Sequence, residues 1–216
     1  MSTPSFINNR AFNKGGAICL DDSAEVHIFI SSHTKRLIQG NTADGRKNAI
    51  HLGKESTLSC EIEEYELLSI YDEFSNDDNA QLKVKGKGNI EFFEGSDLGN
   101  TNVTIEKSGY SIKNGNHTYQ SLVMSQNAKF DISGQAVSIE IKNKLNVEDS
   151  TLKVGLFIDQ EDVERSHSSE IKANKVSFNG SENTIEIKPN IRRGQGSKEF
   201  KYYMQEIQLK ETIKLS

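Results

Sequence analysis

The sequence predicts an all-β protein, a right-handed parallel β-helix of about 8 to 9 rungs. Its 216 residues include 19 Asn and 16 Gly but only 2 Pro, and 34% of them are hydrophobic. The apolar residues stand in short alternations, in which every second side chain faces a core as in a β-strand. These alternations recur about every 20 residues, with Asn and Gly between them as turn signals.

The N-terminal part, residues 6–60, contains two related copies. Residues 6–28 lie over residues 38–60 at an offset of 32 without gaps, and the copies share Asn9/Asn41, Ala17/Ala49 and Ile18/Ile50. This offset exceeds the later repeats, so we expect an inserted loop around residues 31–36. Phe6 should fill the interior, and Asn9 and Asn41 should stack as a hydrogen-bonded ladder at a corner.

The corner that follows carries three small residues, Gly15, Gly16 and Ala17. The two glycines allow a tight turn and a close approach to the neighbouring rung. Ala17 is small enough for a crowded corner before Ile18 enters the core.

Regular rungs are expected over residues 82–187, where two series of inward pairs return at nearly constant intervals. The first consists of Ile90/Phe92, Tyr110/Ile112, Phe130/Ile132 and Leu152/Val154, with Val176 as its next member, and the second of Leu82/Val84, Val103/Ile105, Leu122/Met124 and Leu145/Val147. A patchier third series runs from Val137/Ile139/Ile141 to Leu156/Ile158 and Ile185/Ile187. The inward side chains of one series should pile into a column. An antiparallel β-sandwich is the alternative fold, because its strands also alternate. Residues 200–216 are expected to form a C-terminal cap, as a helix or a last strand.

Two tetrapeptides near the N-terminus, FINN (residues 6–9) and GGAI (residues 15–18), carry a family resemblance. They resemble the FxxN and GGA(I/L/V) motifs in the passenger repeats of bacterial polymorphic outer membrane proteins, a branch of the autotransporters. The sequences IQGN (residues 38–41) and KNAI (residues 47–50) look like a degenerate second copy.

This resemblance implies a non-catalytic, adhesin-like passenger segment that spans residues 1–199. Its partner would be a host-cell surface receptor or glycan. The segment would be covalently part of a longer autotransporter chain, at the cell surface or outer membrane or secreted, and we expect this chain to lack its own signal peptide. The residues that the resemblance assigns to binding are Phe6, Asn9, Gly15, Gly16, Ala17, Ile18, Asn41, Ala49 and Ile50.

Two other functions remain open, a passive spacer and a carbohydrate-active β-helix, such as a polysaccharide lyase or hydrolase or a tail-spike-like protein. The second would need clustered carboxylates on one outer face. The candidates are Asp21, Asp22, Asp77, Asp78, Asp97 and the acidic residues of 159–162. None recurs at the rung interval beside a basic residue, so no catalytic residue is predicted.

Charge and composition exclude several other classes. A net charge of −5 argues against nucleic-acid binding, and no apolar run is long enough to span a membrane. The histidines and cysteines lack the spacing of a metal site, so no metal or cofactor is expected. Strand parity predicts a free, core-facing Cys60, an outward Cys19, and solvent-facing His27 and His51.

Overall fold

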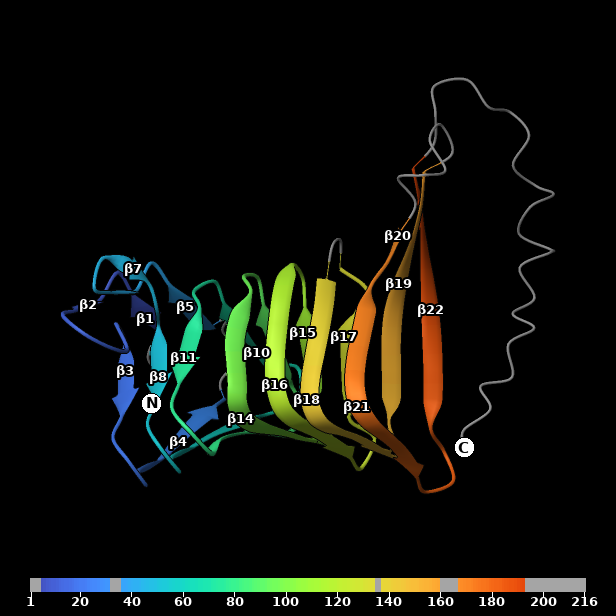
Figure 1. Cartoon of the computed structure of the whole chain (residues 1–216), viewed down its shortest axis with the longest axis horizontal. Helices are drawn as coiled ribbons and strands as arrows, with labels where there is room; N and C mark the ends of the chain where they lie inside the picture. Colours follow the sequence, from blue (N-terminus) through green and yellow to red (C-terminus); the bar gives the residue numbers. More distant parts are fainter. Residues whose placement is uncertain (1–4, 32–35, 135–136, 160–166, 193–216) are drawn as a thin grey trace.

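The computed structural model in Figure 1 describes residues 5–31, 36–134, 137–159 and 167–192. Within these ranges the chain is all-β and contains no helix. The strands follow one another along the longest axis of the molecule, from the blue N-terminal end to the orange C-terminal end (Figure 1). The predicted all-β class is therefore confirmed. The expected cap, residues 200–216, lies outside the described ranges, as does most of the loop expected around residues 31–36.

Sheet A contains nine strands, eight of which run parallel. The parallel strands are β1 (Phe6–Ile7), β5 (Arg36–Gln39), β10 (Leu67–Ile70), β13 (Asn89–Phe92), β15 (Gly109–Ile112), β17 (Lys129–Ile132), β19 (Thr151–Asp159) and β22 (Thr184–Arg192). The short strand β20 (His167–Ser168) pairs antiparallel with β19.

Sheet D contains seven strands in a parallel ladder. They are β4 (Glu25–Ile30), β9 (Thr57–Ile62), β12 (Ala80–Gly86), β14 (Ser96–Glu106), β16 (Gly115–Ser125), β18 (Val137–Glu148) and β21 (Glu170–Asn179). The register shifts within the pairings of β14 with β16, of β16 with β18 and of β18 with β21. In Figure 1 these long strands bend, so one strand contributes to two faces.

Two small sheets complete the N-terminal part. Sheet C consists of the parallel strands β3 (Ile18–Leu20), β8 (Ile50–Leu52) and β11 (Phe74–Asn76). Sheet B consists of β2 (Arg10–Ala11), β6 (Thr42–Ala43) and β7 (Arg46–Lys47), of which β6 and β7 form an antiparallel pair. This pair lies in the interval between Ile38 and its sheet A partner Ile70, which is ten residues longer than the next one, from Leu68 to Ile90.

The strand register confirms the two main series. In sheet A, Ile90 pairs with Tyr110, Tyr110 with Phe130 and Phe130 with Leu152. In sheet D, the second series pairs in the same way, from Leu82 to Leu145. The offset of 32 is also correct, since Phe6 pairs with Ile38 and Ile18 with Ile50. Because these ladders are parallel, the antiparallel sandwich is wrong.

The third series and the place of Val176 are wrong. Val176 pairs with Leu145 in sheet D, whereas the partner of Val154 in sheet A is Ile187. Leu156 lies in sheet A, on the same strand as Leu152, and not beside Ile139 in sheet D. The cause is a longer repeat, because Leu152 and its partner Ile185 are 33 residues apart.

The core lies between the sheets and consists of the inward columns. Phe92, Tyr110 and Phe130 are at most 1% exposed, and their rings contact one another at centroid distances of 4.9 and 5.5 Å. Burying one such side chain contributes about 1.5 to 3 kcal/mol. Alternate positions face outward, so a core forms even though only 34% of the residues are hydrophobic. In the described ranges there is no helix of the length and apolarity needed to cross a membrane.

Candidate functional site

The residues of the FxxN motif form a polar ladder at one corner. The Asn9 side-chain amide donates to Oδ1 of Asn41 at 2.9 Å, which confirms the expected stack. The Asn41 amide in turn donates to Oδ2 of Asp72 at 2.9 Å and to the carbonyl of Phe6 at 3.0 Å. The backbone N–H groups of Gly40 and Asn41 also donate to the Asp72 carboxylate. Asn41 is fully buried and Asp72 is 2% exposed, so this ladder joins three successive repeats inside the fold.

The small residues of the second motif allow two segments of backbone to meet. Gly15 has a φ of +57°, which glycine adopts without steric cost. A Cβ atom on Gly16 would lie 2.6 Å from the backbone N and O of Thr42, in the next repeat. Ala17 donates its N–H to the carbonyl of Ala49 at 2.8 Å, so the two alanines stand in register.

The remaining motif residues belong to the core rather than to an open surface. Ile50 and Ala49 are buried, while Phe6 and Ile18 are partly buried and pack against the same core. Among the predicted residues, only Asn9 is both polar and exposed, and its amide is used in the ladder. The geometry of these residues therefore accounts for their presence as builders of the corner.

A different group of side chains converges on the outer face of sheet C. Cys19, His51 and Ser75 are paired neighbours on β3, β8 and β11, so they form one outward column. Next to this column stand Lys14, from the segment between β2 and β3, and Asp77, directly after β11. We call Lys14, Asn48, His51, Ser75 and Asp77 the sheet C cluster.

Hydrogen bonds connect the sheet C cluster into one chain. The Asn48 side-chain amide donates to Oγ of Ser75 at 2.8 Å, and Oγ lies 2.9 Å from Nδ1 of His51. The other ring nitrogen, Nε2, lies 3.2 Å from Oδ2 of Asp77. The ammonium group of Lys14 donates to both carboxylate oxygens of Asp77, at 2.9 and 3.2 Å. Hydroxyl, imidazole, carboxylate and ammonium thus follow one another directly.

The electrostatics of the cluster keep His51 neutral. Burial lowers the pKa of His51 below its usual value, and the Lys14 charge lowers it further, against the opposite effects of Asp77 and Asp22. The hydrogen bond from Lys14 likewise lowers the pKa of Asp77. At neutral pH the cluster therefore contains an uncharged imidazole beside an ionised carboxylate.

A shallow pocket of about 460 Å³ opens over this face. Besides the cluster members Lys14, His51 and Asp77, it is lined by Cys19, Leu20, Asp21, Asp22 and Gly53. Three of the predicted carboxylates, Asp21, Asp22 and Asp77, therefore meet in one pocket beside a lysine. The structure does not bring Asp78 or Asp97 into this pocket lining.

The prediction that His51 faces solvent is wrong. Its parity is outward as expected, but it is only 4% exposed because Cys19 and Ser75 flank it and the Lys14–Asp77 ion pair stands beside it. His27, by contrast, has 57% of its side chain exposed, as predicted. Sequence reasoning also missed Ser75. Its interval of 24 residues from His51 matches that between Leu58 and Leu82, and that interval was the available signal.

The cysteines are both free, and their positions agree with the prediction. Cys19 is exposed and Cys60 is buried. Burial raises the pKa of the Cys60 thiol to about 12, so this side chain behaves as a small apolar core residue.

A second polar group lies inside the core. The Tyr119 hydroxyl lies 3.1 Å from that of Tyr110 and 3.3 Å from Nδ1 of His117. All three residues are at most 1% exposed. Burial lowers the pKa of His117 to about 4, so its imidazole is neutral in the folded protein at pH 7.

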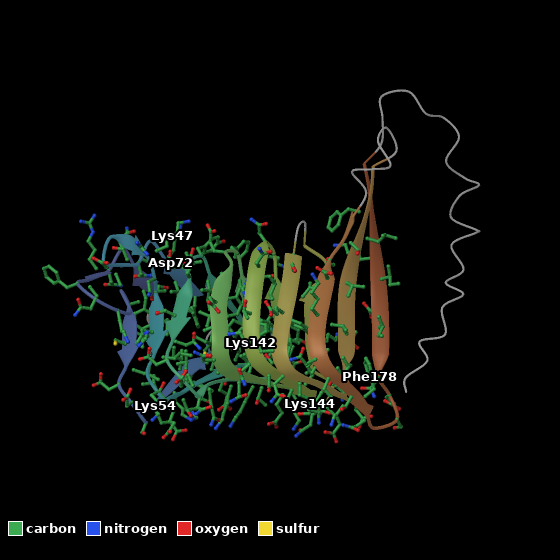
Figure 2. All side chains as sticks on the ribbon, in the orientation of Figure 1. Lys47, Lys54, Asp72, Lys142, Lys144 and Phe178 are labelled. Atoms are coloured by element: carbon green, nitrogen blue, oxygen red, sulfur yellow. The ribbon has the colours of Figure 1, made fainter. Side chains whose placement is uncertain are left out.

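An aromatic pair stands at the outer edge of sheet A. Tyr71 and Phe93 follow β10 and β13, are partly exposed, and stack with their ring centroids 4.3 Å apart and an interplanar angle of 9°. Beside this pair, Lys47 forms an ion pair with Glu94 at 2.7 Å. Lys47 is labelled close to Asp72 at the upper edge of the molecule in Figure 2.

Within the described ranges, no group of three or more His, Cys, Asp or Glu side chains is arranged to hold a metal ion. Comparisons of this chain with protein-family models, with curated proteins and with solved structures found no match.

Proposed function

We propose that the four sheets are faces of a right-handed parallel β-helix. The parallel ladders support this winding, as does the constant order in which the chain visits sheet A and then sheets C and D. Parallel strands that are joined by a crossover are right-handed in almost all proteins, which supports the handedness. Eight parallel strands in sheet A and seven in sheet D correspond to about eight rungs.

The proposed function is adhesion by a non-catalytic passenger segment of an autotransporter-like surface protein. Two features support it. The FxxN and GGA motifs serve to join successive repeats, as a repeated building motif should. The outer faces carry Lys and Glu side chains of both signs, including the ion pairs Lys47–Glu94 and Lys113–Glu91. Such a stack presents a long, rigid surface to a host-cell receptor or glycan.

One observation carries the adhesion proposal, namely the partly exposed stack of Tyr71 and Phe93 on this charged surface. Aromatic side chains surrounded by polar groups dominate the energetics of many protein interfaces. The pair also has low conformational entropy to lose on binding, because each ring already holds the other in place.

The test is binding of the purified chain, labelled with a fluorophore, to epithelial cells and to an immobilised glycan panel. We expect saturable binding that the double variant Tyr71→Ala/Phe93→Ala loses. Tyr65→Ala is the matched control, because Tyr65 is an isolated aromatic residue with 86% exposure. Absence of saturable binding by the unmodified chain would overturn the adhesive function, and equal loss in both variants would overturn the role of the aromatic pair.

A second candidate function is favoured by the pocket on sheet C, where Asp21, Asp22 and Asp77 meet beside Lys14. Glycosidases and lyases act through carboxylates and bases on one face of a sugar chain. Incubation with a panel of polysaccharides would reveal new reducing ends or unsaturated products. If no polysaccharide is cleaved, this second candidate is refuted, and the adhesive proposal is unaffected.

A further inference from the structure

The hydroxyl, imidazole and carboxylate of Ser75, His51 and Asp77 stand in the order in which serine hydrolases use them. We propose that the pocket over sheet C is a serine esterase site. Ser75 is its nucleophile, His51 its general base and Asp77 the residue that orients His51. This inference goes beyond the adhesive function and does not depend on it, because the aromatic pair belongs to sheet A.

Hydrogen-bond chemistry determines where the protons lie. The Asp77 carboxylate can only accept, so Nε2 of His51 carries the ring proton and donates it. In the neutral ring, Nδ1 is then an acceptor. Because Asn48 already donates to Oγ of Ser75, the Ser75 hydroxyl is free to donate its own proton to Nδ1. The two ring nitrogens are exchanged relative to the usual triad, but the direction of proton transfer is the same.

The pocket indicates the class of substrate. Asp21, Asp22 and Asp77 are acceptors suited to sugar hydroxyl groups, and they repel an anionic substrate. The side-chain oxygen of Asn48 is buried without a hydrogen-bond partner in the described part of the chain, which leaves an acceptor beside Ser75. Lys14 provides a positive charge for an oxyanion. The geometry thus points to a small acyl ester, such as an O-acetyl group, on a neutral sugar.

The reaction balances without a cofactor. Oγ of Ser75 attacks the ester carbonyl carbon while its proton passes to Nδ1 of His51. The carbon–oxygen bond to the sugar breaks, and the sugar oxygen takes that proton and leaves as an alcohol. Water then attacks the acyl-Ser75 carbonyl and gives a proton to His51, which returns it to Oγ as the carboxylic acid leaves. The sum is ester plus water to acid plus alcohol.

The first experiment treats the purified chain with a fluorophosphonate probe and locates the adduct by peptide mass spectrometry. We expect one adduct, on Ser75. His51→Gln should slow the labelling by about 10²-fold, the usual contribution of a general base. Ser111→Ala, on the outer face of sheet A, is the matched control and should label like the unmodified chain. Labelling that spares Ser75 overturns the proposal without any variant having to fold.

The second experiment measures turnover. Acetate release from p-nitrophenyl acetate and from peracetylated cellobiose should fall to background in Ser75→Ala and remain in Ser111→Ala. Asp77→Asn should move the acidic limb of the pH–rate profile to lower pH, because Asp77 raises the pKa of His51. An unmoved limb overturns the orienting role of Asp77. Adduct formation on Ser75 without release of sugar acetate overturns the substrate class.

Discussion

Replacement of Asn41 by Ala tests the corner ladder most directly. The Asn41 side chain makes four hydrogen bonds: its oxygen accepts two from Asn9, and its amide donates to Phe6 and to Asp72. The variant removes all four but keeps the backbone donors of Gly40 and Asn41 on the Asp72 carboxylate. The buried charge therefore loses one of its three partners.

The expected loss of stability follows from these bonds. A typical hydrogen bond contributes about 0.5 to 1.5 kcal/mol net, and more when one partner is charged. Water can replace some of the lost partners near the exposed Asn9 but not near Asp72, so we expect a loss of about 3 kcal/mol. Asn9→Ala removes only the amide donor at 2.9 Å and should cost about 1 kcal/mol.

Hydrogen exchange followed by mass spectrometry is the appropriate assay, because each repeat contacts only its neighbours and can open locally. A loss of about 3 kcal/mol corresponds to roughly a 10²-fold loss of protection. It should be confined to the first three repeats, including the amide of Thr42, which donates to Asn9. Asn102→Ala, an outward residue of sheet D, is the control. Unchanged protection in residues 5–62, or an equal loss in sheet D near Asn102, would refute the reasoning.

Two further predictions concern the motif glycine and the buried histidine. Gly16→Ala should destabilise the protein by about 1 to 3 kcal/mol, because the new Cβ meets the backbone of Thr42, and its urea midpoint should fall. An unchanged midpoint would contradict the close approach. His117 has a folded pKa of about 4 against an ordinary value of 6.5, so the unfolded chain binds its proton first as the pH falls. Stability should therefore decline between pH 6.5 and 4 by about 3 kcal/mol through this group. His117→Gln should flatten that part of the curve in pH-dependent urea titrations, and identical slopes would show that His117 does not titrate in this way.

The columns of the core were predictable because a chain that returns at a constant interval shows its register in the sequence. Ile90, Tyr110 and Phe130 recur every 20 residues, and their pairing follows. The prediction fails at Val176, where the repeat lengthens by the residues of β19 and β20. Apolar periodicity reports the spacing of strands but not the length of an excursion between them.

The corners were predictable only in part. Asn and Gly suggested left-handed turns, yet only three of the ten non-glycine residues with positive φ in the described ranges are Asn. Glu55, Tyr65 and Lys107 adopt the same conformation. The ladders on both sides of a corner fix its path, so their hydrogen bonds outweigh the cost of about 1 to 2 kcal/mol for a side chain there.

By itself, the sequence determined the strand class, the inward columns and the Asn9–Asn41 ladder, because each follows from local alternation and a constant return interval. Only the tertiary structure decided what meets on the outer face. Lys14 and Asp77 are 63 residues apart, yet they form an ion pair beside His51. Parity shows on which side of a sheet a residue lies, but neighbouring repeats decide what covers it. His51 is for that reason a buried base beside Ser75 rather than a surface histidine.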